Sequence, residues 1–178
     1  MQFKISLKWF IIVISIVVIA FSLLLIFFLT EKSATSSNVN KSGIPMSYYT
    51  NIIKDTEENE NFRRVLFTGS KSQLVVMSIP SGTDIGEETH KYTEQTLFFL
   101  SGTGEGELDG KKFPIGPGDV VVVVPGTKHN FRNTGTVPLK LYTVYAPPNH
   151  IDGRIHTTKA DADSDMADEA IGETEPLK

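Results

Sequence analysis

Short runs of β-branched and aromatic residues, separated by turn residues, constrain the fold of this 178-residue chain more than any other feature. The runs between residues 63 and 148 are RRVLFTG, QLVVMSIP, QTLFFLSG, GEGELDG, DVVVVVP and LKLYTVYAPP. Gly, Pro, Asp and Ser separate them at short intervals, as is typical of consecutive β-strands. Many short strands without a long amphipathic helix predict an all-β sandwich or barrel. No internal repeat is visible, so we expect a single barrel over residues 47–158.

Residue types that bind metal ions occur in two of the strand-rich segments. Alternation along a strand places Glu88 and His90 on the same face. Glu87 is the alternative inward carboxylate, but strand alternation places it on the face opposite to that of His90. Further on, five consecutive valines (120–124) precede a turn and then His129, which indicates a buried strand that delivers one imidazole to the interior.

The spacing of these residues resembles the two motifs of the cupin superfamily, G-x5-H-x-H-x3/4-E-x6-G and G-x5-P-x-G-x2-H-x3-N. The first spacing is matched by Gly82, Glu88, His90, Gln95 and Gly102, and the second by Gly118, Val124, Gly126, His129 and Asn133. Three residue types depart from the motifs, since Glu88 replaces a His, Gln95 replaces the Glu and Val124 replaces the Pro. The resemblance covers about residues 60–150. It implies a cupin barrel, that is, a jelly-roll or double-stranded β-helix.

The resemblance also implies that the barrel holds one divalent metal ion, Fe, Mn, Ni or Zn. The ligands at the motif positions would be Glu88, His90, Gln95 and His129. This set has the same formal charge as three His and one Glu, and Gln coordinates through its carbonyl oxygen. Glu88 and the two histidines alone form a two-His, one-carboxylate set of the kind used for non-haem iron. We expect Asn133 to stabilise a turn instead of binding the ion.

Strand alternation predicts the side chains around this ion. The expected inward residues are Gln95, Leu97, Phe99, His129, Phe131, Leu139, Leu141, Thr143 and Tyr145. Such a pocket would be mostly apolar and aromatic, with the metal as its main polar feature. The candidates for its mouth are Tyr92, Tyr145, His150 and His156. Of these, we name Tyr92 and Tyr145 as candidates for catalytic proton transfer.

A run of apolar residues from position 9 to 30, WFIIVISIVVIAFSLLLIFFLT, contains no charge and is long enough to cross a bilayer as a helix. The alternative, a cleaved signal peptide, usually has a shorter apolar region, and the small-residue site near Ser33 and Ala34 is poor. We therefore expect a single-pass membrane anchor after a short tail (1–8). Lys4 and Lys8 favour a cytoplasmic N-terminus, with the barrel on the opposite side.

The barrel is flanked by polar segments. Residues 31–46, rich in Ser and Asn, predict a flexible linker, and the acidic residues 159–178 predict a disordered, solvated tail. The net charge of -4 and the lack of a basic cluster give no reason to expect nucleic acid as a partner. The absence of cysteine excludes thiolate zinc sites and disulfides.

Two classes of function remain open. In the first, the protein is a metalloenzyme for a small molecule, either an isomerase or epimerase or a cupin-type dioxygenase. In the second, it is a non-catalytic binding or sensing module whose metal is structural or absent. The stretches NENFRRVLFTG, DIGEETH and HNFRNTG look like those of small stand-alone cupins described as similar to mannose-6-phosphate isomerase. Such cupins usually lack a membrane helix, fold does not fix the reaction, and a homodimer through barrel edges is a further expectation.

Overall fold

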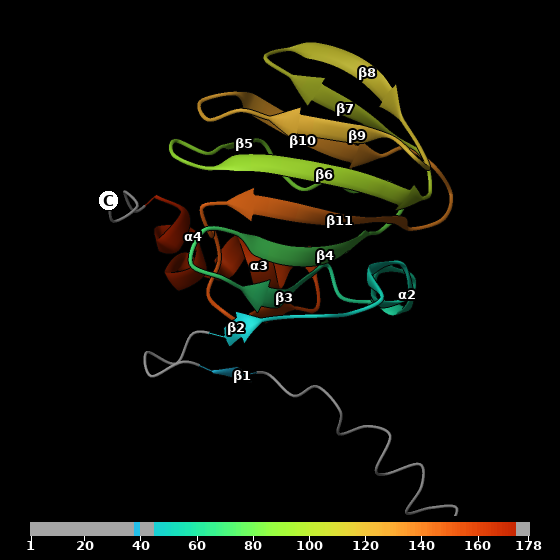
Figure 1. Cartoon of the computed structure of the whole chain (residues 1–178). Coiled ribbons are helices and arrows are strands. Elements are labelled where there is room, and N and C mark those ends of the chain that lie inside the picture. The colour runs from blue at the N-terminus through green and yellow to red at the C-terminus, as the bar shows by residue number, and fades with distance from the viewer. Residues whose placement is uncertain (1–37, 40–44, 174–178) are drawn as a thin grey trace, which may run out of the picture. The chain divides into compact units, whose positions relative to one another are not determined.

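The computed structural model describes residues 38–39 and 45–173 (Figure 1). The predicted membrane helix (9–30), the tail before it and most of the predicted linker lie outside these residues. Within the part that the structure describes, no helix has both the length and the apolar character needed to cross a membrane. The anchor therefore stays a prediction.

Two antiparallel sheets form the barrel that the strand pattern predicts. The six-stranded sheet contains, in spatial order, β12 (Ile155–His156), β3 (Arg63–Thr68), β4 (Gln73–Ile79), β11 (Leu139–Ala146), β6 (Glu94–Ser101) and β9 (Val120–Val123). The four-stranded sheet contains β5 (Glu88–Thr89), β10 (Lys128–Asn133), β7 (Gly104–Leu108) and β8 (Lys111–Ile115). The chain passes from one sheet to the other between β4 and β5, β5 and β6, β6 and β7, β8 and β9, β9 and β10, and β10 and β11 (Figure 1). This crossing confirms the jelly-roll prediction.

The interior of the barrel follows the predicted alternation. The expected inward residues of β6, β10 and β11 are all buried: Gln95, Leu97, Phe99, His129, Phe131, Leu139, Leu141, Thr143 and Tyr145. Asn133 is buried as well, and its side-chain amide donates to the carbonyls of Ile79 and Val137, both at 2.8 Å. It therefore ties a turn together, as expected.

The valine run differs from the prediction of a fully buried strand. Val121 and Val123 point inward, whereas Val120, Val122 and Val124 are each about half exposed. As in every strand of the barrel wall, one face of β9 meets the core; because β9 is the edge strand and has only β6 as a neighbour in its sheet, its outward valines are left more exposed. An exposed edge of this kind suits the expected homodimer, which stays a prediction.

Three further elements lie before β3. The strands β1 (Asn38–Val39) and β2 (Pro45–Ser47) pair with each other, and all of their residues except Ser47 fall in the segment predicted as a linker. The helix α2 (Ile52–Glu58) is capped by Asn51, whose side chain accepts a hydrogen bond from the Lys54 amide.

The C-terminal segment differs from the predicted disordered tail (159–178). It forms two short helices, α3 (Lys159–Ser164) and α4 (Met166–Gly172), shown in red in Figure 1. Thr158 and Asp161 form a capping box at the start of α3, and Asp165 caps α4. Asp168, in the first turn of α4, is only 2% exposed. The carboxylate of Asp168 therefore takes part in ion pairs inside the protein and does not simply face solvent.

Candidate metal centre

Strand pairing brings three of the four predicted ligands together. The pairing of β10 with β5 places His129 opposite Glu88, and His90 follows β5 directly. Ligand atoms of Glu88, His90 and His129 all lie within 4.8 Å of one another. The Glu88 Oε2 atom lies 3.4 Å from His90 Nε2 and 3.8 Å from His129 Nε2. Three groups with metal-ligand chemistry thus converge on one point.

His129 is held in the tautomer that a metal ligand needs. Its Nδ1–H donates to the carbonyl of Thr127 over 2.9 Å, so the lone pair of Nε2 faces the cluster. Burial lowers the pKa of His129, although the bond to Thr127 and the charge of Glu88 oppose this shift. The imidazole is therefore neutral at pH 7, which is the form that coordinates a cation.

Glu88 supplies the negative charge of the cluster. Burial alone would raise the pKa of Glu88, but its contact with His90 and the charge of Arg63 outweigh this and lower the pKa to about 2. Its neighbour Glu87 is exposed and pairs with Lys128 at 2.8 Å. Of the two carboxylates, Glu88 therefore lies with His90 and His129, whereas Glu87 faces solvent.

Unpartnered atoms show that these residues fit a cation. The Nε2 atoms of His90 and His129 are buried and have no hydrogen-bond partner among the described residues. A buried polar atom without a partner costs about 1–3 kcal/mol. A divalent ion between the two nitrogens and the Glu88 carboxylate would satisfy all three groups at once.

Gln95, the fourth predicted ligand, is buried next to this cluster. Its Nε2 donates to the Tyr145 hydroxyl at 3.0 Å, and the edge of the Tyr145 ring packs against His90, with the ring centroids 5.8 Å apart. The Gln95 Oε1 atom, through which an amide coordinates a metal, has no hydrogen-bond partner within the described part of the chain. Coordination by Gln95 stays a prediction.

Neither of the two tyrosines named as proton-transfer candidates is among the residues that line the cavity beside the cluster, and their catalytic role stays a prediction. Burial raises the pKa of Tyr145 well above its usual range, so its hydroxyl keeps its proton at any physiological pH. Tyr92 does not line the cavity beside the cluster; its ring lies under the Lys91 ammonium, 4.8 Å from the ring centroid.

The cavity beside Glu88 and His90 has a volume of about 340 Å³ and is polar, in contrast to the predicted apolar pocket. Among the described residues that line it, only Ile85 and Ala162 have apolar side chains. The predicted aromatic residues lie deeper, where Phe99 and Phe131 pack with their ring centroids 5.6 Å apart. Strand alternation describes the barrel interior, but the cavity opens at the barrel end, where α4 and residues 149–150 contribute its wall.

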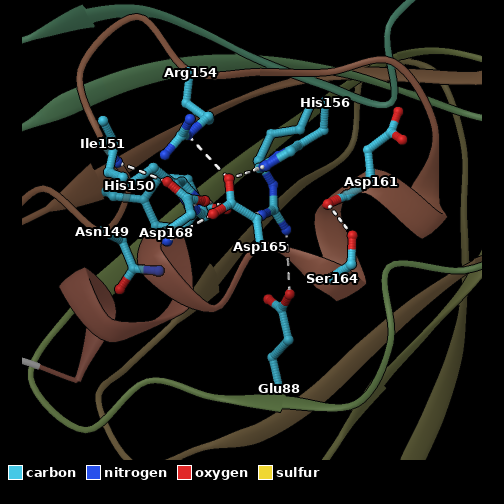
Figure 2. Close-up of polar contacts among 12 residues, drawn as sticks. Glu88, Asn149, His150, Ile151, Arg154, His156, Asp161, Ser164, Asp165 and Asp168 are labelled. Atoms are coloured by element: carbon cyan, nitrogen blue, oxygen red, sulfur yellow. Dashed lines mark hydrogen bonds and ion pairs between the residues drawn. The ribbon is translucent and has the colours of Figure 1, made fainter.

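A chain of ion pairs links the cluster to this wall (Figure 2). Arg63 Nη2 lies 3.4 Å from Glu88 Oε1, and Arg63 Nη1 lies 3.7 Å from Asp168 Oδ2. Asp168 Oδ2 in turn lies 2.8 Å from His150 Nδ1. Of the three residues Arg63, Asp168 and His150, only His150 is among those predicted from the sequence. The capping pattern Thr158-x-x-Asp161 was the available signal that α3 begins there.

The fourth histidine, His156, does not line the cavity. Its Nε2–H donates to Asp165 Oδ2 at 3.0 Å, and the same carboxylate oxygen lies 3.0 Å from Arg154 Nε (Figure 2). This second His–Asp pair joins α4 to β12 and its preceding turn. We therefore assign His156 a structural role.

Comparison with known proteins agrees with this geometry. Residues 75–145 match the family model of the cupin domain. The uncharacterised protein YrkC of Bacillus subtilis is 43% identical over 124 residues, which are 66% of this chain and 67% of YrkC. The crystal structure of BH2720 from Bacillus halodurans matches with a TM-score of 0.66 and 39% identity, over 67% of this chain and 96% of that one. A protein of Thermotoga maritima named as oxalate-binding is 32% identical over 68 residues, 38% of this chain and 56% of its own length.

A two-sheet jelly roll with histidine and carboxylate side chains converging at one end defines a class of small β-barrel proteins with a candidate metal site. Within that class, the chain belongs to the cupin superfamily.

Proposed function

We propose that this protein is a metal-dependent cupin that binds one divalent ion through Glu88, His90 and His129, with Gln95 as a fourth ligand, and takes a small molecule in the adjoining cavity. The observation that carries the proposal is the pair of buried, unpartnered Nε2 atoms beside an ionised carboxylate. A bound ion would supply Lewis-acid polarisation of a carbonyl or hydroxyl oxygen of that molecule.

Charge indicates which molecules suit the cavity. Besides Arg63, which already contacts two carboxylates, the charged residues that line it are Glu87, Glu88, Asp163, Asp168, Glu169 and Glu173. A second negative charge on a ligand would meet this excess of carboxylates at close range. The cavity therefore favours an uncharged polar molecule, such as a hydroxy-aldehyde or hydroxy-ketone, over a dianion. This favours isomerase or epimerase chemistry, and a dioxygenase is the alternative if the ion is iron.

A non-catalytic binding role is the second candidate, because one relative is named as an oxalate-binding protein. Titration calorimetry of the metal-loaded protein with oxalate and with dihydroxyacetone separates the two. Binding of oxalate in preference to the uncharged compound would support the binding module and would contradict the charge argument.

The metal proposal is tested by elemental analysis of the purified full chain. We expect about one equivalent of Fe, Mn, Ni or Zn, and we expect the His90→Ala, His129→Ala double variant to lose it. His156→Ala is the matched control, because it removes a buried histidine that lies outside the cluster. A folded parent that stays free of metal after supplementation would overturn the proposal.

We also propose that residues 9–30 anchor the protein in a membrane, with the barrel on the side opposite the cytoplasm. The apolar, uncharged character of this run supports the proposal. Membrane fractionation of the full chain and of a chain that lacks residues 9–30 tests it. Equal partition of both chains into the soluble fraction would contradict it.

A further inference from the structure

The cavity holds a second histidine–carboxylate pair that is not part of the metal cluster. His150 lines the cavity and is 7% exposed, and its Nδ1–H donates to Asp168 Oδ2 at 2.8 Å. Its other ring nitrogen, Nε2, is buried and has no hydrogen-bond partner among the residues that the structure describes. Figure 2 shows His150 and Asp168 together, with Asn149 beside them. One imidazole nitrogen is thus fixed and the other is free.

Asp168 is held firmly in its position. Its Oδ1 atom accepts a hydrogen bond from the Ile151 amide at 2.7 Å, and the Arg63 guanidinium lies near its Oδ2 atom. Burial alone would raise the pKa of Asp168, but His150, the Ile151 amide and Arg63 together lower it. An ionised Asp168 fixes the proton of His150 on Nδ1, so that the lone pair lies on Nε2.

The backbone and ring of His150 are fixed as well. The Gln73 side chain accepts from the His150 amide at 2.9 Å and donates to the His150 carbonyl at 2.8 Å. The Tyr145 ring meets the imidazole edge-on, with centroids 4.9 Å apart. Strands β4 and β11 therefore position an imidazole that the C-terminal helix orients.

His156 and Asp165 show what a structural pair looks like in the same region. In that pair Nε2 carries the bond to the carboxylate, and neither residue lines the cavity. His150 differs from His156 in its place on the cavity wall and in the ring nitrogen that is left free.

We propose that His150 is the proton-transferring residue of the cavity and that Asp168 is its positioning residue. This rests on the proposed function, because it requires that the cavity takes a substrate. His150 Nε2 removes a proton from a carbon next to a carbonyl group of the bound molecule, and the electron pair of the broken C–H bond stays on that molecule. Nδ1–H remains bonded to the Asp168 carboxylate, which stabilises the imidazolium, and Nε2 returns the proton to the molecule.

The protonation state of the free imidazole agrees with this role. Burial lowers the pKa of His150, while the bond to Asp168 opposes that shift and the charge of Arg63 adds to it. His150 is therefore neutral at pH 7 and able to accept a proton.

The chain contains only four histidines, so the chemical reactivity of each one can be measured separately. The zinc-loaded full chain is treated with diethyl pyrocarbonate, which acylates neutral, accessible imidazole nitrogens, and the products are located by mass spectrometry. We expect slow modification of His150, whose ring borders the cavity although its Nε2 is largely covered, protection of His90 and His129 by the zinc, and still less modification of His156, which does not line the cavity. Continued modification of His90 and His129 at saturating zinc would overturn the metal proposal. Protection of those two residues with an unreactive His150 would overturn the present inference alone.

Proton transfer itself is tested with dihydroxyacetone in D₂O, by proton NMR of its carbon-bound hydrogens. The metal-loaded parent should exchange them, and His150→Gln should slow the exchange by at least about 100-fold, the usual contribution of a general base. Asp168→Asn should slow it by about tenfold or more and move the midpoint of its pH profile downward, because the imidazolium loses its carboxylate. His156→Gln is the control and should exchange at the parental rate.

Metal content and circular dichroism of each variant show whether it has folded and loaded. Exchange at the parental rate in a loaded His150→Gln variant would overturn the proposal, as would a metal-loaded parent that does not exchange. An unchanged pH profile in Asp168→Asn would overturn the positioning role of Asp168.

Discussion

Two regions of the molecule meet at the cavity, and they are built in different ways. The strands β5 and β10 supply Glu88 and His129 through a local ladder, in which the register alone places the two side chains opposite each other. The helix α4 supplies Asp168, whose partners Arg63 and His150 come from distant parts of the chain. Backbone pairing thus places Glu88 and His129, two of the candidate ligands. Ion pairs between buried side chains hold the opposite wall of the cavity.

This difference determines how each region should respond to change. The side chain of a candidate ligand such as His129 can be removed while the backbone pairing of β5 and β10 remains. The expected loss is therefore in metal binding. A wall that is held by buried ion pairs should lose stability when one partner is removed, because the remaining charge is left in a poorly solvated place.

The largest effect is expected from deletion of residues 159–178. The deletion removes Asp165 and Asp168 and leaves His150, His156 and Arg154 without their carboxylates. We expect the free energy of unfolding to fall by about 3–5 kcal/mol, the usual cost of breaking buried ion pairs, as measured by urea denaturation. A loss below about 1 kcal/mol would show that the helices only cover the barrel.

The next largest effect is expected from a substitution in the paired strands β5 and β10. His129→Ala should weaken metal affinity by more than about 100-fold, since even residues that only support a ligand contribute about 10–100-fold. Competition with a fluorescent chelator measures the affinity. Asp168→Asn, on the opposite wall, should keep the affinity within about tenfold. Equal losses in the two variants would remove the distinction between the regions.

A smaller effect should separate the two His–Asp pairs. Asp168→Asn should lower the free energy of unfolding by about 2 kcal/mol, because its carboxylate has charged partners and is buried. Asp165→Asn should cost about 1 kcal/mol, since Asn still caps α4 and the site is partly exposed. Thermal denaturation compares them, and a reversed order would contradict the assignment of Asp168 as the central carboxylate of this wall.

The smallest effect is expected from pH. The pKa values of His150, Asp168 and Glu88 are all lower in the folded state than their usual values of 6.5, 3.8 and 4.5. The unfolded chain therefore takes up more protons as the pH falls, so stability is complete above about pH 6.5 and decreases below it. For the metal-free chain we expect a loss of about 1–2 kcal/mol between pH 7 and pH 4. Urea denaturation at each pH measures it.

Two variants assign this pH dependence to the two regions. His150→Gln should reduce the slope between pH 6.5 and about 5, where His129, whose pKa is also lowered, still contributes, and Glu88→Gln should flatten the curve below pH 4.5. A parental curve in both variants would show that other groups control acid stability.

The barrel strands and their inward faces were predictable because the alternation of a strand is local, whereas the grouping of Glu88 and His90 with His129 was expected from the resemblance to the cupin motifs. Glu88 was preferred to Glu87 by alternation with His90, and the inward residues of β11 followed from the exposed Lys140. Both inferences need only the period of a strand. The exposure of Val120 and Val122 was not predictable in this way, because alternation does not tell an edge strand from a central one.

The cavity wall could not be predicted, since its determinants are pairwise and distant. An acidic segment has the same composition whether its carboxylates face water or a buried arginine. Composition alone predicts a solvated tail at Asp168, since its partner Arg63 lies in β3 and nothing in the sequence links the two. The capping signal at Thr158 indicated a helix but not what the helix would contact.

The order of the elements along the chain affects the order in which the cavity is assembled. During synthesis, Glu88, His90 and His129 emerge well before Asp168, so the barrel strands can pair while His150 still lacks its carboxylate. Because α4 follows the barrel strands in the sequence, the candidate metal ligands can come together before Asp168 reaches His150. The candidate metal cluster and the proposed proton-transferring pair are thus completed at different times.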